Sequence, residues 1–385
     1  MKKSQKLKDE IDILLVTDNG IETVGGEQES VKIIINGLKK KYRMGIIQPG
    51  NINNPIPRIH YFPLTEYTRI KHFVKNPIIF FGYIWKIRKI INTENPKIIH
   101  TQAQVSFFIV ALLKKLKLIS SRSKLIHTER GLYIRYLPIF KSLFHLFFNE
   151  LDGFITTTQY NMNYWKKGLK QKKYDTSSNV IENTAGELFE IYDESKEKLG
   201  ERLVIGFAGR YSEQKDWPLA VEICRRLNNV IPNQFEVWMA VGCLDEKSKV
   251  ITKRMFLEVQ KLLGDDFKGK INIGLQEMDQ LYYDTDIFIM TSKPNSESFG
   301  RTIVEAMSRN CAVLTTDAGG PVEIIRNKSS ICRNAKEFSD KVLELREKNN
   351  LLFNEKIENK KYVSTKYSTL NNIKKHKLLY EKYLN

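Results

Sequence analysis

The sequence predicts two consecutive α/β domains, each a parallel β-sheet with helices packed on its faces. Short β-branched runs alternate with longer helical patterns along most of the chain, which is typical of repeated strand–helix–strand units. The chain has 385 residues, more than one compact core of ordinary size holds, so two domains of about 150–200 residues each are expected. Hydrophobic residues make up 42% of the chain, which is enough for both cores and excludes intrinsic disorder as the main state. We expect the two domains to face each other across a cleft.

The first domain is predicted to span residues 1–185. Its strands are expected where β-branched and aliphatic residues run together, at Ile11–Thr17, Met44–Gln48, Lys97–Thr101, Lys124–Thr128 and Gly153–Thr157. Helical patterns between them predict helices at Glu27–Lys40, Ile79–Asn92, Ser106–Leu116 and Ile139–Asn149.

A second series of the same kind begins at Leu203, and the second domain is predicted to span residues 201–352. Its expected strands are Leu203–Ala208, Phe235–Val241, Lys270–Ile273, Ile287–Thr291 and Ala312–Thr316. Its expected helices are Trp217–Asn228, Lys247–Leu263 and Arg301–Arg309. Residues 186–200 mix acidic and basic side chains without β-branched alternation and are predicted to be the linker. In the polar stretch 353–385, Tyr and Leu are spaced to bury one helical face.

Neither a secretion signal nor a membrane span is expected. Acidic residues follow the N-terminal lysines at once, so no uninterrupted apolar segment forms there. The longest apolar stretches, 77–85 and 105–113, are well short of the roughly 18–20 residues that a span needs. The four cysteines are scattered without CxxC spacing, which fits core packing in a reducing cytosol and no zinc site.

The composition is strongly basic, with 62 Lys and Arg against 44 Asp and Glu and a net charge of +18. This excess indicates anionic partners, which could be nucleic acid, a membrane surface or phosphate-bearing substrates. Residues 31–150 hold 21 Lys and Arg and only four Asp and Glu, so nearly the whole excess lies in the first domain. There, basic runs alternate with large apolar residues such as Phe81 and Trp85, as on surfaces that bind anionic lipid. The alternative is that the apolar residues face the sheet and the cations are solvated.

Two strand-to-helix loops have the features of ligand sites. In open parallel sheets, ligands bind beyond the carboxyl ends of the strands, where helix N-termini present unpaired N–H groups. Gly25 and Gly26 follow the first strand and permit close backbone approach, although a tight turn explains them equally well. Gly209 ends a later strand, and Arg210 and Lys215 follow in its loop, where a planar fork and a point charge could hold one diphosphate. The alternative is a pair of solvated surface cations.

Two carboxylates, Glu297 and Glu305, flank the start of a helix predicted near Gly300. Their spacing does not fit a capping box, which uses a three-residue interval. One carboxylate is therefore expected at the helix N-terminus and the other deeper along the helix. Asp284 and Asp286 have the look of a metal-binding Asp-x-Asp pair, but their place at a helix end favours a capping or solvated role.

These motifs resemble those of the family 4 retaining glycosyltransferases, which have the GT-B fold of two Rossmann-like domains. The segment 297–300, Glu-Ser-Phe-Gly, is similar to the family's Glu-Gly-Phe-Gly, and Glu305 matches the second carboxylate of that motif. The resemblance is strongest over 203–325 and extends more loosely over nearly the whole chain. It implies that the helices of 353–385 pack back towards the first domain.

Two further motifs carry the resemblance. Gly209, Arg210 and Lys215 match the family's Gly-Arg and Lys motif, although Asp216 stands where glycine usually follows the lysine. Gly319, Gly320 and Glu323 match a later Gly-Gly-x-x-Glu motif.

The resemblance implies a role for each matched residue on the donor side. Arg210 and Lys215 would neutralise the donor diphosphate, Glu297 would position hydroxyls of the donor sugar, and Glu305 would bind the ribose. The implied catalytic residues are Glu297, Arg210 and Lys215, and the implied donor-binding residues are Gly209, Arg210, Lys215, Glu297, Ser298, Phe299, Gly300 and Glu305. No metal and no other cofactor is expected, because the two cations stabilise the leaving group.

On the acceptor side, the resemblance implies cleft positions at Gly25, Gly26, His100 and Arg130. Many family members have a histidine against the donor sugar where this chain has Arg130. Arg130 either pairs with an anionic group of the donor or acceptor, or forms a structural salt bridge to Glu129 or another loop carboxylate.

The expected function is sugar transfer with retention from a nucleotide-diphosphate donor, with UDP-sugar favoured by family frequency. The expected acceptor is membrane-associated or anionic, in the synthesis of a cell-surface polysaccharide, glycolipid or teichoic acid. Such an enzyme would be cytoplasmic and peripheral on the inner face of the cell membrane. A soluble small-molecule acceptor is the alternative. A nucleic-acid-binding protein is an alternative of another class, but the chain has no helix-turn-helix, RNP or zinc signature.

Overall fold

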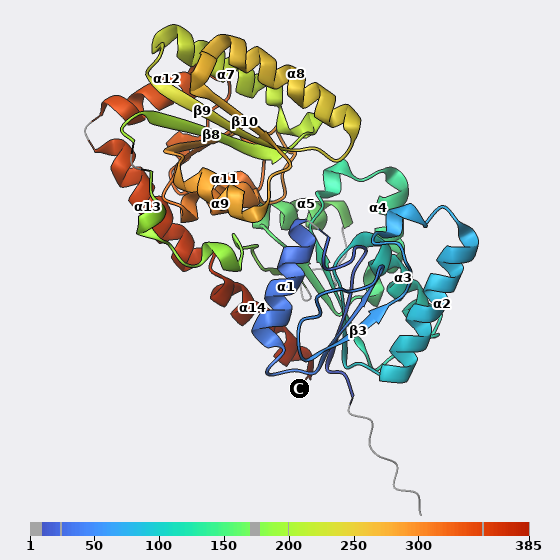
Figure 1. The fold of residues 1–385 in the computed structure, drawn as a ribbon. Helices are drawn as coiled ribbons and strands as arrows, with labels where there is room; N and C mark the ends of the chain where they lie inside the picture. The colour runs from blue at the N-terminus through green and yellow to red at the C-terminus, as the bar shows by residue number, and fades with distance from the viewer. Residues whose placement is uncertain (1–9, 24, 170–177, 199, 349, 385) are drawn as a thin grey trace, which may run out of the picture. The chain divides into compact units, whose positions relative to one another are not determined.

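The protein folds into two compact α/β units, each built on a parallel sheet (Figure 1). The computed structural model describes residues 10–23, 25–169, 178–198, 200–348 and 350–384. One unit comprises residues up to Glu182 together with 370–385, and the other comprises 183–369. The predicted fold class, two Rossmann-like domains with a C-terminal helix returning to the first, is confirmed. The division of the chain differs from the expected boundaries, because 186–200 belongs to the second unit and only 370–385 returns to the first.

The first unit contains a seven-stranded sheet in which all described pairings are parallel, in the order β3-β2-β1-β4-β5-β6-β7. The central strand β1 is buried along its whole length, and its Ile13 pairs with Met44 of β2 and Ile98 of β4. Continuous apolar strands of this kind are typical of parallel sheets covered on both faces. The strands are β1 (Ile13–Val16), β2 (Met44–Gln48), β3 (Ile59–Pro63), β4 (Ile98–Thr101), β5 (Lys124–Glu129), β6 (Gly153–Thr156) and β7 (Ser178–Val180).

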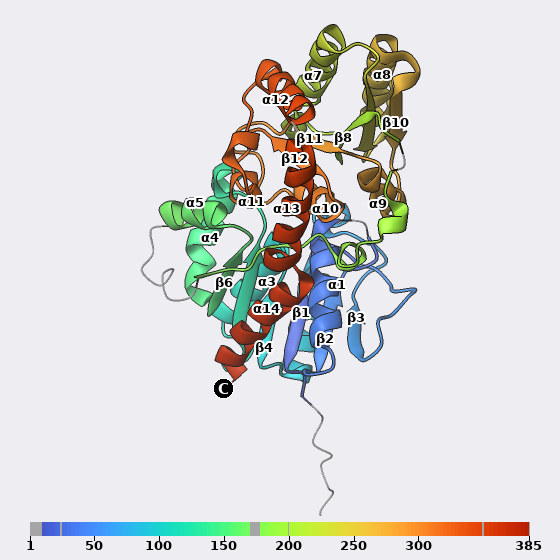
Figure 2. The same ribbon diagram turned by 90° about the vertical axis from the view of Figure 1, so that its left-hand side faces the viewer.

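Helices cover both faces of this sheet. They are α1 (Gly26–Leu38), α2 (Pro77–Glu94), α3 (Gln104–Lys115), α4 (Pro138–Phe147), α5 (Gln159–Leu169) and the C-terminal α14 (Thr369–Leu384). Figures 1 and 2 both show α14 lying beside α1, and Ile373 of α14 fills the space next to Gly37 of α1, where a Cβ atom would clash. Leu379 and Tyr380 of the same helix complete the core on that face of the sheet. Among the described residues, none of the helices combines the length and apolar character that crossing a bilayer requires.

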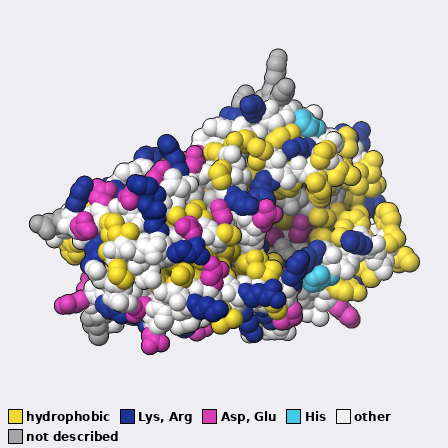
Figure 3. Space-filling view, turned by 90° about the horizontal axis from the view of Figure 1, so that it is seen from above, with side chains coloured by type: hydrophobic (Ala, Val, Ile, Leu, Met, Phe, Trp, Pro, Cys, Tyr) yellow, Lys and Arg dark blue, Asp and Glu magenta, His cyan; other side chains and the backbone are white. Residues whose placement is uncertain are grey.

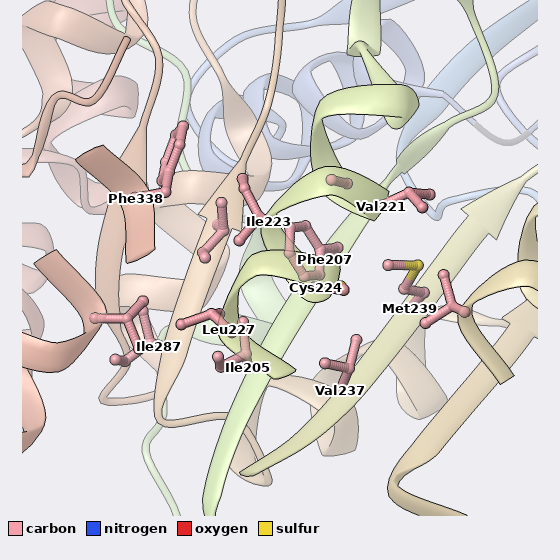
Figure 4. Close-up of a cluster of buried hydrophobic side chains, with 14 of the residues drawn as sticks. Ile205, Phe207, Val221, Ile223, Cys224, Leu227, Val237, Met239, Ile287 and Phe338 are labelled. Atoms are coloured by element: carbon pink, nitrogen blue, oxygen red, sulfur yellow. The ribbon is translucent and has the colours of Figure 1, made fainter. Parts of the chain in front are cut away.

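The second unit contains a five-stranded parallel sheet in the order β10-β9-β8-β11-β12. The strands are β8 (Leu203–Arg210), β9 (Phe235–Gly242), β10 (Phe267–Ile271), β11 (Ile287–Met290) and β12 (Ala312–Thr315). The helices are α7 (Trp217–Val230), α8 (Glu246–Leu263), α9 (Leu275–Tyr283), α10 (Arg301–Ser308), α11 (Pro321–Ile324), α12 (Ala335–Glu347) and α13 (Leu351–Lys366). Figure 4 shows one half of its core, where Ile205 and Phe207 of β8 pack against Cys224 and Leu227 of α7. All four cysteines of the chain are buried and free, as expected.

Each sheet changes direction of strand addition beside its first strand. The chain moves outward from β1 to β2 and β3 and then returns to β4 on the other side of β1, and β8 stands in the same relation to β9 and β11. At such a switch point two neighbouring loops diverge and leave a crevice at the carboxyl edge of the sheet. In the second unit, the loops that follow β8 and β11 therefore start next to each other.

Candidate functional site

The loops after β8 and β11 bring Lys215 and Glu297 together. Lys215 ends a short 3₁₀ helix (Glu213–Lys215) in the first loop, and Glu297 lies in the second. The Lys215 Nζ lies 2.9 Å from the Glu297 Oε1, and both side chains are largely buried. Ser292 donates a hydrogen bond of 3.2 Å to the same carboxylate oxygen, and the Thr291 hydroxyl donates to the Lys215 carbonyl oxygen at 2.9 Å. The two loops thus hold each other through both backbone and side chains.

Gly209 and Arg210 end β8 at the same edge. The Lys215 side chain lies against Gly209, where a Cβ atom would be in van der Waals contact with it at 3.4 Å. Arg210 is exposed, and its carbonyl oxygen accepts a hydrogen bond from the Trp217 indole at 3.2 Å. One exposed guanidinium and one ammonium therefore stand at one switch point, which is an arrangement suited to a diphosphate.

Asp216 follows Lys215 with φ 44° and ψ 52°, in the left-handed region. Glycine enters this region without strain, and Asp is among the few other residues that tolerate it. Asp216 therefore occupies a backbone conformation that suits glycine, at a conformational cost.

The segment Ser298, Phe299 and Gly300 leads into α10. Gly300 has φ 98° and precedes the first helical residue, while Phe299 is buried against Tyr367. Gly320 of the neighbouring loop approaches so closely that a Cβ atom there would lie 2.2 Å from the Ser298 carbonyl oxygen. The Gly320 amide donates to the Glu297 carbonyl oxygen at 3.0 Å. A larger residue would clash at this position, which explains why the second residue of the Gly-Gly motif is glycine.

Glu305 lies one turn into α10 and is largely buried. It accepts a hydrogen bond from the Tyr282 hydroxyl at 3.0 Å and lies 3.3 Å from the Arg301 Nε. Arg301 in turn donates to the Ala185 carbonyl oxygen at 3.0 Å. The carboxylate is thus held by Tyr282 of α9 and by Arg301 of its own helix, and Arg301 is in turn anchored to the segment before β8.

The Asp-x-Asp pair has structural partners. Asp284 follows the last residue of α9 as its C-cap. Asp286 accepts a hydrogen bond from the Val204 amide at 2.9 Å and pairs with Lys198 at 2.5 Å and Lys356 at 3.0 Å. Within the part of the chain that the structure describes, no group of three or more His, Cys, Asp or Glu side chains has the arrangement of a metal site.

In the first unit, His100 was expected at a cleft, but the structure places it in the protein interior. The side chain is fully buried, and its Nδ1 lies 2.7 Å from the Tyr380 hydroxyl and its Nε2 2.8 Å from the Thr128 hydroxyl. Burial holds the pKa of His100 well below its usual range, so the ring is neutral. His100 therefore joins the sheet to α14, because a side chain from the C-terminus covers it.

Gly25 and Gly26 form the start of α1, with Gly25 as its N-cap. A Cβ atom on Gly25 would lie 2.3 Å from the Gln28 Oε1. Arg130 directs its guanidinium to Gln102, donating to the carbonyl oxygen at 2.8 Å and to the Oε1 at 2.9 Å. The neighbouring Glu129 instead accepts from the Gly131 amide at 2.6 Å and the Tyr136 hydroxyl at 2.9 Å.

Two buried carboxyl groups at this edge, Asp18 and Glu27, were not singled out from the sequence. Asp18 follows β1 and accepts hydrogen bonds from the Val105 and Ser106 amides at the start of α3, at 3.0 and 2.7 Å. Glu27 accepts from Asn19 at 2.7 Å. Burial and the nearby charge of Asp18 raise the pKa of Glu27 to about 7, against the opposing effect of the Arg130 charge. The sequence could have indicated both residues, because Asp18 directly follows the first predicted strand and Glu27 directly follows the paired glycines.

Comparison with known families identifies both halves of the chain. The family model described as "Glycosyltransferase Family 4" matches residues 24–182, and the model described as "Glycosyl transferases group 1" matches residues 189–364. No curated protein matches the chain significantly.

Solved structures of the same fold cover nearly the whole chain. Anabaena HepE in complex with UDP-glucose is 15% identical with a TM-score of 0.74, covering 96% of this chain and 99% of its own. Sucrose-phosphate synthase from Thermosynechococcus elongatus is 14% identical with a TM-score of 0.79, covering 96% and 98%. The lipopolysaccharide outer core galactosyltransferase WaaB is 12% identical with a TM-score of 0.66, covering 97% and 100%. Each unit thus matches one glycosyltransferase family model, the first unit that of family 4, and the chain has the GT-B fold of these solved structures.

Proposed function

We propose that this enzyme transfers a sugar, with retention of configuration and without a metal ion, from a UDP-sugar donor to a membrane-associated or anionic acceptor. The observation that carries the proposal is the Lys215–Glu297 pair beside Arg210, at the switch point between β8 and β11. It combines two cations suited to a diphosphate with a carboxylate suited to sugar hydroxyls. The structures of Anabaena HepE with UDP and with UDP-glucose support a uridine nucleotide as the donor carrier.

In this mechanism, Arg210 and Lys215 stabilise the negative charge that develops on the diphosphate as the bond from the sugar C1 to the phosphate oxygen breaks. The acceptor hydroxyl attacks C1 from the same face, and the leaving phosphate oxygen takes the hydroxyl proton. The configuration at C1 is thereby retained without a protein nucleophile. Glu297, held by Lys215 and Ser292, positions the donor sugar, and Glu305 accepts hydrogen bonds from the ribose hydroxyls.

The acceptor is proposed from the charge of the first unit. A segment with 21 Lys and Arg against four Asp and Glu, over residues 31–150, attracts an anionic substrate or an anionic surface. A lipid-linked precursor of a cell-surface polysaccharide, glycolipid or teichoic acid meets that condition, and the likeness to a lipopolysaccharide galactosyltransferase agrees with it. The alternative is a soluble sugar phosphate, since sucrose-phosphate synthase has the same fold.

A donor screen tests the proposal. The protein is incubated with UDP-, GDP- and ADP-sugars in the presence of EDTA, and melting temperature and slow donor hydrolysis are measured. A ligand that binds only the folded state at about one hundred times its dissociation constant stabilises by about 2.7 kcal/mol, which a melting curve resolves readily. We expect stabilisation and hydrolysis with a UDP-sugar. The absence of both with every nucleotide sugar would contradict the proposal.

A further inference from the structure

Helix α2 leaves an apolar stripe uncovered. Its buried face carries Tyr83, Ile87 and Ile91, which pack into the core of the first unit. The opposite face carries Ile78, Phe81 and Trp85, with exposed fractions of 83%, 69% and 58%. The spacing of three and four residues places these side chains on one side of the helix. The helix is therefore apolar on two faces. One face packs into the core, and the other is exposed.

A second uncovered apolar group lies on and just before α4. Phe144 and Phe147 of this helix are buried in the same core that α2 covers. The exposed apolar side chains are Ile134, Leu137, Ile139 and Leu146. Figure 3 shows hydrophobic side chains gathered on the right-hand side of the view, over the first unit, with Lys and Arg side chains between them. We call the exposed residues 78, 81, 85, 134, 137, 139 and 146 the α2–α4 surface.

The chain around the α2–α4 surface is basic. Residues 71–146 contain 14 Lys and Arg and only two Asp and Glu. Lys89 lies 5.6 Å above the Trp85 ring and Lys141 lies 5.1 Å above the Tyr133 ring, so long cationic side chains lie along aromatic groups. Lys71 and Lys75, just before α2, are exposed. Apolar side chains with cations around them are the pattern of interfacial helices on anionic lipid.

We propose that the α2–α4 surface docks on an anionic lipid bilayer, with Ile78, Phe81, Trp85, Leu137 and Ile139 entering the boundary between head groups and acyl chains. The cations around them meet lipid phosphates. A bilayer is favoured over a second copy of the chain because two such basic surfaces would repel each other. The inference rests on the proposed function for its purpose, since a membrane-linked acceptor requires an enzyme at the membrane, and it defines which face of the first unit meets that membrane.

Vesicle sedimentation tests the proposal without any donor or acceptor. The whole protein is mixed with vesicles of one part phosphatidylglycerol to three parts phosphatidylcholine, and with vesicles of phosphatidylcholine alone. We expect binding to the anionic vesicles that weakens as salt is raised, and much weaker binding to the neutral vesicles.

Two double variants divide the surface, and a third serves as the matched control. Phe81→Ser with Trp85→Ser changes α2, and Leu137→Ser with Ile139→Ser changes the start of α4. Each is expected to lower the vesicle partition coefficient about tenfold or more, because apolar side chains no longer enter the lipid. The control, Val250→Ser with Leu257→Ser, removes two apolar residues of α8 that are 48% and 62% exposed in the second unit. It is expected to bind vesicles like the wild type.

Tryptophan fluorescence gives a second measurement of the same contact. Trp85 is exposed, whereas Trp165 and Trp217 are buried and Trp238 is half-buried in the second unit. Anionic vesicles are therefore expected to shift the emission of the wild type to the blue, and Trp85→Phe, which keeps an apolar ring, should bind vesicles but lose most of that shift.

Equal vesicle binding by the wild type and both surface variants would overturn the proposal. So would a wild-type mass in solution that corresponds to a dimer and falls to that of a monomer in the surface variants, without vesicle binding. These outcomes are independent of the donor screen. A protein that binds vesicles but no nucleotide sugar contradicts the proposed function alone, and one that hydrolyses donor but ignores vesicles contradicts the docking surface alone.

Discussion

Lys215 and Glu297 come from loops that follow two different strands, yet their charged atoms lie 2.9 Å apart. Their meeting depends on the order of strands in the sheet, because β8 and β11 are neighbours only after the chain has passed through β9 and β10. The pair therefore connects sheet topology with the chemistry proposed for the donor site.

Replacement of Lys215 tests the proposed diphosphate contact. Lys215→Ala is expected to lower the kcat of donor hydrolysis by about 10²–10³, the usual effect of removing one preorganised donor from a developing charge. The matched control is Lys293→Ala, which removes a half-exposed lysine of the β11 loop that pairs with Glu213 at 3.0 Å. If the two variants hydrolyse the donor at equal rates, Lys215 has no special role.

Replacement of Glu305 tests its proposed contact with the ribose. Glu305→Gln keeps the shape but removes the charge, and it is expected to raise the donor KM about tenfold or more with a smaller change in kcat. Tyr282→Phe removes only the hydroxyl that donates to this carboxylate at 3.0 Å, so a smaller rise in KM is expected. A fall in kcat with an unchanged KM would assign Glu305 to the chemical step instead.

The left-handed backbone of Asp216 predicts a stabilising substitution. Asp216→Gly is expected to raise the free energy of unfolding by up to about 1 kcal/mol, because glycine adopts φ 44° without the penalty that a Cβ atom brings. Asp265→Gly, at an exposed position without positive φ, is the control and is expected to destabilise. Chemical denaturation of both variants measures the difference, and destabilisation by Asp216→Gly would show that the carboxylate has a role of its own.

The buried histidine of α14 predicts a loss of stability in acid. Burial lowers the pKa of His376 to about 4, with the Arg130 charge acting in the same direction and the Asn372 carbonyl oxygen opposing. The unfolded chain thus takes up a proton near pH 6.5 that the folded chain refuses, and up to about 3 kcal/mol of stability should be lost as the pH falls from 6.5 to 4. His376→Gln should weaken this dependence, although buried His100 adds one of the same sign, whereas replacement of the exposed His72 should leave it unchanged. Parallel curves for wild type and His376→Gln would contradict the prediction.

The buried carboxyl group of Glu27 predicts that stability depends on pH in the opposite direction. Because its pKa is raised to about 7, the folded chain keeps a proton that the unfolded chain releases near pH 4.5, so the contribution of this proton to stability is lost as the pH rises through 7. Glu27→Gln removes this titration, and its stability relative to the wild type should increase between pH 5 and pH 8. Denaturant midpoints at several pH values measure the difference, and a constant difference would mean that Glu27 is ionised throughout.

The strands that the sequence predicted well are those buried on both faces. β2 was predicted with its observed bounds because apolar side chains face both sides of the sheet there. The two edge strands of the first sheet were missed for the opposite reason. β3 is partly exposed and ends in proline, and β7 is three residues long and mostly polar, so neither shows the continuous apolar run of a central strand.

The candidate site was predictable as a set of residues but not as a set of contacts. A helix was predicted to begin near Phe299 or Gly300, between Glu297 and Glu305, and α10 begins at Arg301. The partners of His100 were beyond prediction, since Tyr380 reaches it from the last helix. Whether a side chain at a strand end faces a ligand or the core depends on which distant segment packs over it. The spacing of residues along the strand does not reveal that segment.

The return of α14 to the first unit has a consequence for the order of folding during synthesis. Residues 183–369 form a separate unit, so its contacts are available before α14 has been made. The first unit lacks Leu379 and Tyr380 until α14 has been made, which leaves the part of that sheet face not covered by α1 exposed. The half of the enzyme that is made first is therefore the last to be finished, and a nascent chain arrested before α14 should present that face to chaperones.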